Sequence, residues 1–211
     1  APIQCRIDAR AAGTCVIDSL TTFNPLSHPE TTPFKTQPRF LAGVQASGGT
    51  DRFRYFISAE REEETGPYEM PEAEIARLTT VRGVRPPEEH IHPNRLRQNS
   101  FRGNFSLGLG GTADLTISTG YIDRRLSTPF DGPYFAGLSF QTYFAPGFRT
   151  VTNGTSAQHI GDILSVEQQL NDQRLTGSAT LTWTPLSWLA GRAVVGIDQT
   201  QGYGYRFNRF G

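Results

Sequence analysis

Long hydrophobic runs are missing from this chain of 211 residues, and so is an excess of charge of either sign. No stretch approaches the roughly 18 consecutive apolar residues that a transmembrane helix needs. Only strands are therefore able to place this protein in a membrane. The 20 basic residues balance the 20 acidic ones, and Lys35 is the only lysine. This balance leaves no net field that would attract nucleic acid.

Cysteine is scarce as well. Cys5 and Cys15 are the 2 cysteines, and the small residues Ala11, Ala12 and Gly13 lie between them. An even number of cysteines at close spacing predicts a small disulfide-closed loop in an oxidising compartment, although two free thiols are the plain alternative. A pair of histidines is not found nearby, so a structural zinc site is not expected.

Motifs of catalysis and of phosphate binding are also missing. The glycines at 48–49 and 110–111 join strand to strand, so they are not placed to cradle phosphate as a P-loop does. No serine lies in a strand-turn-helix elbow. We predict no enzyme, no cofactor and no metal site. No charged and apolar leader opens the sequence, and we expect the chain to begin within a longer protein.

Alternation of apolar and polar residues is what the chain does have. Residues 40–64 predict two strands folded back around Ser47-Gly48-Gly49-Thr50, because glycine allows the positive φ of a tight hairpin turn. Side chains that alternate with a period of two lie on opposite faces of a sheet. The residues predicted to share the apolar face are Phe40, Ala42, Val44, Ala46, Phe53, Tyr55, Ile57 and Ala59.

Two further hairpins repeat this layout. Strands at 96–109 and 113–121 flank the turn Gly110-Gly111-Thr112. The turn at 184–187 joins a strand at 175–183 to a strand that begins at Leu189 and has Tyr203, Tyr205, Phe207 and Phe210 at its far end. The residues predicted on the apolar face of these strands are Phe101, Gly103, Phe105, Leu107, Leu109, Ala113, Leu115, Ile117, Thr119, Tyr121, Leu175, Gly177, Ala179, Leu181, Trp183, Leu189, Ala193, Val195 and Ile197.

The connections between hairpins are long. We predict exposed loops at 65–95 and 123–172, with a helical turn or two at 71–80 and a short strand formed by Leu138, Phe140, Thr142 and Phe144. Residues 1–38 are predicted to be a disulfide-bearing connector, whose proline-rich part at 24–38 is irregular. Residues 39–211 then carry the strands.

These features predict an all-β fold, namely part of an antiparallel up-and-down transmembrane β-barrel with about six strands. The apolar faces extend over about nine to eleven residues, the span of a tilted bilayer strand. Tryptophans mark one margin and tyrosines the other. The opposite face carries charges that suit a water-filled lumen: Arg54, Glu60, Arg102, Arg192 and Asp198. Six strands do not close, so the barrel is incomplete on its own. A soluble sandwich or lipocalin-like barrel also alternates, and stays open as an alternative.

Several short motifs resemble those of one family when they are taken in order along the chain. They are Cys5 with Gly13-Thr14-Cys15, Asn24-Pro25-Leu26, Thr32-Pro33-Phe34, Ser47-Gly48-Gly49-Thr50-Asp51-Arg52, Arg54-Tyr55-Phe56, Pro93-Asn94, Asn99-Ser100-Phe101-Arg102-Gly103-Asn104, Trp183-Thr184-Pro185-Leu186-Ser187-Trp188-Leu189 and Gly196-Ile197-Asp198. Together they resemble TonB-dependent outer-membrane receptors of the SusC-like (RagA-type) branch.

The resemblance implies a 22-stranded barrel in the bacterial outer membrane. An N-terminal domain would plug its lumen, and the receptor would work by energised import. It implies as partners the membrane lipid, the rest of the receptor, the TonB complex and a SusD-like surface lipoprotein that captures glycans or peptides. This chain would supply the link out of the plug and the first several strands. The imported ligand is not specified.

Candidate ligand contacts follow from this picture. In the lumen they are Arg54, Glu60, Arg102 and Asn104, and on the loops they are Tyr134, Phe135, Tyr143 and Phe144. His90 and His92 would point the same way in an extended segment, which a metal could use, but an exposed polar loop is the favoured interpretation. The acidic run at 60–64 suits calcium or a solvated strand end. Two other classes stay open: a structural β protein that assembles through open strand edges, and a soluble carbohydrate-binding sandwich.

Overall fold

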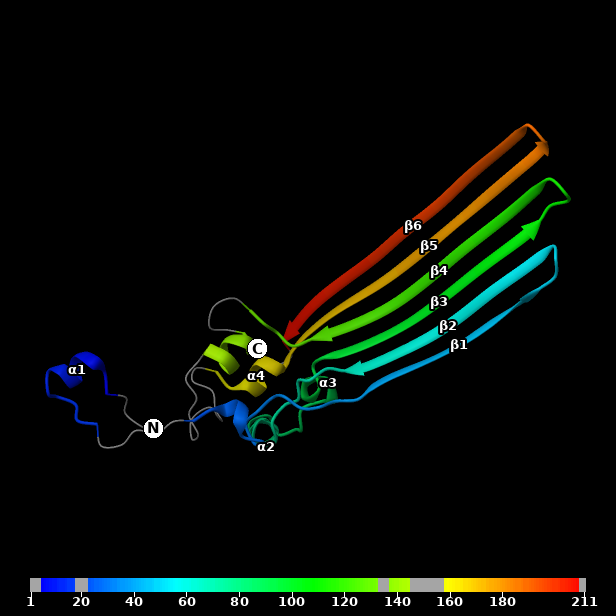
Figure 1. Ribbon diagram of the computed structural model, residues 1–211. Coiled ribbons are helices and arrows are strands. Elements are labelled where there is room, and N and C mark those ends of the chain that lie inside the picture. Colours follow the sequence, from blue (N-terminus) through cyan, green and yellow to red (C-terminus); the bar gives the residue numbers. More distant parts are fainter. Residues whose placement is uncertain (1–4, 18–22, 133–136, 145–157, 209–211) are drawn as a thin grey trace.

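The computed structural model describes residues 5–17, 23–132, 137–144 and 158–208. It is mostly β, and its strands form one antiparallel up-and-down sheet in the order β1-β2-β3-β4-β5-β6 (Figure 1). The strands are β1 (Arg39–Gly49), β2 (Phe53–Thr65), β3 (Arg95–Gly108), β4 (Ala113–Thr128), β5 (Val166–Leu186) and β6 (Leu189–Asn208). The sheet is not closed: within the described residues, β1 and β6 each pair on one side only. The predicted all-β fold is confirmed.

The register confirms the predicted division of side chains between two faces. Along the middle of β2 to β5, the cross-strand rows on one face join mainly apolar or small residues. One row runs Val44, Ala59, Phe101, Tyr121 and Leu175, and the second row from it on the same face runs Tyr55, Phe105, Ile117, Ala179 and Val195. We call the side of these rows the apolar face and the other side the polar face.

The two ends of the sheet differ in their connections. At one end, here the turn end, tight turns join β1 to β2, β3 to β4 and β5 to β6 (Figure 1). Gly49 has φ 146° and Gly110 has φ 78°, which are conformations that favour glycine. An added Cβ at Gly49 would lie 2.0 Å from the carbonyl oxygen of Phe53. The third turn was predicted at 184–187 but is shorter and lies at 187–188, because β5 continues to Leu186 and β6 begins at Leu189.

Strands β4 and β5 are longer than the sequence predicted. β4 continues to Thr128 and β5 begins at Val166, so the second long connection spans 129–165 rather than 123–172. The added parts of these strands carry mainly polar side chains on both faces. Alternation of apolar and polar residues therefore gives no signal there, whereas backbone pairing with the neighbouring strands continues.

The long connections form a helical cap at the other end of the sheet, here the cap end. The cap contains α2 (Glu72–Arg82), α3 (Glu88–Ile91), the π-helical turn η3 (Phe140–Phe144) and α4 (Ile160–Leu164). Among the described residues, the cluster of buried hydrophobic side chains that forms the core belongs to this cap. Its members are Met70, Ile75, Leu78, Ile91, Leu138, Ile160, Ile163 and Leu164. The expectation of exposed loops at 65–95 and 123–172 is thereby corrected, because two segments far apart in the sequence bury one another.

Local sequence explains where α2 begins and ends. Pro71 precedes it, Glu72 and Glu74 lie in its first turn, and Gly83 ends it in the left-handed conformation at φ 73°. This is the proline-first, glycine-last pattern of helices. The predicted strand at 138–144 is wrong: residues 138–144 are helical, and Thr142 donates a 2.8 Å hydrogen bond to the carbonyl oxygen of Leu138. None of the helices in the described ranges is long and apolar enough to cross a membrane.

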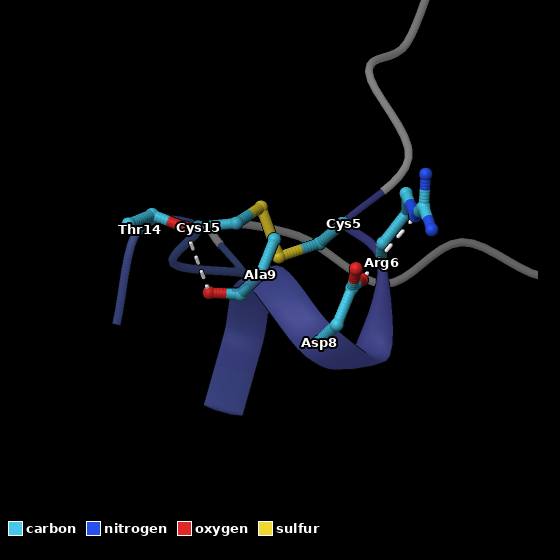
Figure 2. The surroundings of a disulfide bond; sticks show 6 residues. All are labelled: Cys5, Arg6, Asp8, Ala9, Thr14 and Cys15. Atoms are coloured by element: carbon cyan, nitrogen blue, oxygen red, sulfur yellow. Dashed lines mark hydrogen bonds and ion pairs between the residues drawn. A yellow bond between two sulfur atoms is a disulfide. The ribbon is translucent and has the colours of Figure 1, made fainter. Parts of the chain in front are cut away.

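The N-terminal segment carries the disulfide that the cysteine spacing predicted. Cys5 and Cys15 are bonded and enclose α1 (Ile7–Ala11), as Figure 2 shows. The hydroxyl of Thr14 and the amide of Cys15 both donate to the carbonyl oxygen of Ala9. No residue of α1 is buried. The loop is therefore a small self-contained unit.

Residues 23–38 approach β1 at the cap end. Phe34 forms an isolated β-bridge with Tyr68. The amide of Lys35 donates to the carbonyl oxygen of Pro67, and the amide of Glu69 donates to that of Pro33, each over 2.8 Å. Apart from the single turn η1 (Pro25–Ser27), this connector is irregular, as predicted.

Candidate functional site

The apolar face is bare in the structure. Its large residues are half-buried or exposed, with Phe101 at 52% and Val195 at 69% exposure. No second layer among the described residues covers it. The apolar rows extend on β4 from Ala113 to Tyr121, and at about 3.4 Å per residue this is about 27 Å along the strand.

Aromatic residues border this apolar band at both ends. Trp183 lies in the row nearest the turn end, and Trp188 lies in the turn itself. On β6, Tyr203 and Tyr205 lie on the same face towards the cap end, beyond the band. The predicted placement of tryptophans at one margin and tyrosines at the other is confirmed.

A pocket of about 740 Å³ lies on the polar face, over the middle of β2 to β6. Three of the predicted lumen residues, Glu60, Arg102 and Asn104, line it. Serine and threonine hydroxyls supply most of the remaining polar lining: Ser58, Ser100, Ser118, Thr176 and Ser178. Gly120 lies at its centre, where an added Cβ would meet the Thr176 hydroxyl oxygen at 2.8 Å. The missing side chain deepens the pocket.

An ion pair borders the pocket. The guanidinium of Arg174 donates to both carboxylate oxygens of Asp198, with Nε–Oδ1 at 2.9 Å and Nη2–Oδ2 at 2.6 Å. Both side chains are about half exposed. Besides Arg174 and Asp198, the charged residues that line the pocket are Glu60 and Arg102. A surface with paired charges and many hydroxyls is suited to hydrogen-bonding a neutral polar ligand.

The other predicted contacts lie elsewhere. Arg54 is on the polar face but nearer the turn end, opposite Gly49 and Ser106, and it does not line the pocket. Tyr143 belongs to η3 in the cap, and its ring centroid is 5.9 Å from that of Phe34. Phe144 ends η3. Tyr134 and Phe135 lie outside the described residues. The structure therefore brings Glu60, Arg102 and Asn104 together and leaves Arg54 and Tyr143 apart.

The cap contains a buried carboxylate, that of Glu74. It accepts hydrogen bonds from the Gly161 amide at 3.0 Å and from Arg77 at 2.8 Å, and His159 Nδ1 lies 3.2 Å away. Arg77 also pairs with Asp162 at 3.0 Å. Burial lowers the pKa of Arg77, but its hydrogen bonds to Glu74 and Asp162 outweigh this and leave the pKa raised. The network ties α2 to α4.

His90 and His92 do not form a metal pair. His90 is buried in α3 with Nε2 at 3.0 Å from the Glu167 carboxylate, whereas His92 lies between Glu69 and Glu88. Helical rather than extended backbone at 88–91 separates the two rings. In the described part of the chain, no group of three or more His, Cys, Asp or Glu side chains is placed to hold a metal ion. The acidic run at 60–64 lies within β2.

Sequence reasoning missed Arg174. Its signal was the alternation itself: Arg174, Thr176, Ser178, Thr180 and Thr182 follow every second position of β5. Extending the predicted strand by one residue would have placed Arg174 on the polar face beside Asp198.

Comparison with protein-family models, with curated proteins and with solved structures finds no match for this chain.

Proposed function

We propose that this chain is part of a TonB-dependent outer-membrane receptor that imports a nutrient, such as a glycan or peptide, into the periplasm. The observation that carries the proposal is the two-faced sheet, with a bare apolar band on one face and a charged, hydroxyl-rich pocket on the other. Lipid suits the first face and a water-filled lumen suits the second. A sheet packed in a soluble domain would instead bury its apolar rows.

The dimensions of the band support a membrane position. A strand tilted by 35–45° converts about 27 Å of strand length into about 19–22 Å of membrane thickness, and the aromatic margins extend this towards the about 25 Å band of such barrels. Unpaired backbone is costly in lipid. The open edges of β1 and β6 therefore call for further strands from the rest of the receptor.

Orientation follows from the connections. Outer-membrane barrels have short turns on the periplasmic side and longer loops outside, so the helical cap would face outwards. Residues 23–38 join β1 from the cap end, and any link from a plug domain would have to arrive there. The plug, the TonB complex and a SusD-like surface lipoprotein are proposed from the family resemblance alone.

Two neighbouring valines test the membrane position. Val194 and Val195 are both exposed, at 62% and 69%. Val194 pairs with Thr180 on the polar face, whereas Val195 pairs with Ala179 in the middle row of the apolar band. An arginine on the lipid face near the midplane costs about 2–4 kcal/mol. We expect Val195→Arg to abolish stable integration into phosphatidylcholine vesicles and Val194→Arg to leave it intact.

Flotation with these vesicles after an alkaline wash measures integration. Equal behaviour of the two variants, or a parent chain that stays in the aqueous fraction, would contradict the proposal.

A second candidate is a structural β protein that assembles through its strand edges. The unpaired β1 and β6 edges in the described residues favour it, because exposed edges template pairing with other chains. It predicts ordered multimers in plain buffer without detergent. Sedimentation in buffer and in detergent separates the two candidates, since a receptor part is expected to aggregate without detergent.

A further inference from the structure

Three arginines gather on the apolar face just beyond the band, towards the cap end. The last apolar row contains Ala59, Phe101 and Tyr121. The next row contains Arg61, Asn99 and Asp123, and the row after it contains Glu63, Arg97 and Arg125. We call Arg61, Arg97 and Arg125 the outer arginine cluster. Within two rows the face thus changes from apolar residues to three arginines and two carboxylates, those of Glu63 and Asp123.

Arg97 and Arg125 are directly opposite one another on β3 and β4. Like charges in this position destabilise a sheet. Among the described residues, neither guanidinium has a carboxylate within 4.0 Å. The nearby acids are engaged: Glu63 pairs with Arg61 at 2.5 Å, and Asp123 accepts from Gln173. Glu63 lies opposite Arg97 and attracts it, so the repulsion between Arg97 and Arg125 is compensated only in part within the sheet.

A pocket of about 180 Å³ lies among these side chains. Arg61, Arg97, Asn99, Asp123 and Arg125 line it from the apolar face. Glu62 and Gln98 complete the lining, and the carboxylate of Glu62 is held by Arg39. Arg95 lies one row further towards the cap end, with Glu88 at 3.7 Å. The pocket is polar and adjoins the apolar band.

We propose that the outer arginine cluster binds the phosphate group of an anionic lipid whose acyl chains lie along the apolar band. Guanidinium groups bind phosphate through paired, charge-assisted hydrogen bonds, and a bound phosphate would offset the repulsion between Arg97 and Arg125. Tyr203 shares a row with Arg97 and Arg125, as expected at headgroup depth. The proposal rests on the proposed membrane position of the sheet.

Titration of the chain in neutral detergent tests the headgroup. The probes are phosphatidic acid, diacylglycerol with the same acyl chains, and glycerol 3-phosphate. We expect phosphatidic acid to bind about 10-fold or more tightly than diacylglycerol, since arginines attract the anionic headgroup. Glycerol 3-phosphate should bind far more weakly, because it has no chains to lie on the band.

Variants locate the site. Arg97→Gln with Arg125→Gln should remove the preference for phosphatidic acid, whereas the matched control Arg85→Gln, an exposed arginine in the cap, should keep it. Without lipid, the double variant should melt no lower than the parent, because a like-charge pair is removed. If it fails to fold, Arg125→Lys serves instead: it keeps the charge, loses the paired hydrogen bonds and should bind with intermediate affinity.

Three results would overturn the proposal: equal binding of phosphatidic acid and diacylglycerol, binding unchanged by the cluster variants, or glycerol 3-phosphate binding as tightly as the lipid. The last result would identify a site for soluble anions. Flotation with neutral phosphatidylcholine vesicles separates this failure from that of the proposed function. A chain that floats without a headgroup preference retains the membrane position and loses only the lipid site.

Discussion

The sheet and the helical cap use apolar residues in opposite ways. In the cap, Leu78 and Leu164 are fully buried, whereas on the apolar face of the sheet Leu175 and Leu181 are about 40% exposed. Charge shows the same contrast. Glu74 of the cap is completely buried within a network, while Asp198 of the sheet is half exposed in its pair with Arg174.

This contrast indicates which part supplies its own stability. Burial of apolar surface drives folding in water, and the cap achieves it between two connections of the chain. The sheet relies on backbone pairing and leaves its apolar rows for something else to cover. We therefore expect mutations in the cap to be costly in any solvent and those on the sheet to depend on its surroundings.

The largest expected effect is at Glu74. Glu74→Gln removes the buried carboxylate charge that Arg77 and His159 share and leaves Arg77 paired with Asp162 alone; breaking a buried pair of this kind costs about 3 kcal/mol or more. The matched change Asp198→Asn breaks an exposed pair, so we expect no resolvable loss of stability. Amide hydrogen exchange of α2 and α4, with that of β5 and β6, measures both. Comparable losses would mean that the cap network is not the stabilising element.

Leucine truncation should follow closely. Leu164→Ala removes a fully buried side chain of the cap core and should cost about 2–5 kcal/mol. Leu175→Ala, on the apolar face, should cost less than about 0.5 kcal/mol in detergent, because the leucine and the alanine side chain at this position would both face the detergent. Thermal unfolding in one detergent compares them. If Leu175→Ala proved the more damaging, the apolar face would have to be covered by protein.

The smallest effect is expected at the disulfide. Cys5→Ser with Cys15→Ser opens a loop in which α1 buries no residue. The melting of the sheet and cap should not change, while cleavage by trypsin at Arg6 or Arg10 should become faster as the loop loosens. Limited proteolysis followed by mass spectrometry detects the cleavage. A lower melting temperature of the sheet would show that the loop is docked on it.

The hairpins were predictable because their signals are local. Alternation at Phe53, Tyr55 and Ile57 identifies the face of β2, and the neighbouring glycines identify its turn. The same reasoning placed Glu60, Arg102 and Asn104 on one face, and the pairing of β2 with β3 brings them together. Cysteine spacing likewise predicted the disulfide.

The cap was not predictable in this way. Met70 and Leu78 lie in one connection, and Ile160 and Leu164 lie in another some eighty residues later. Neither segment alone has enough apolar residues to predict a hydrophobic core. Arg174 was missed for a different reason: the predicted strand began at Leu175, although the pattern of Thr176, Ser178 and Thr180 at every second position extends back to Arg174.

The sequence by itself determined the six strands, their two faces and the three tight turns, since each depends on neighbours a few residues apart. Only the tertiary structure decided that the long connections pack into a helical cap and that Arg97 lies opposite Arg125. Those contacts depend on strand register and on packing between distant segments, and a period of two along a single strand carries information about neither.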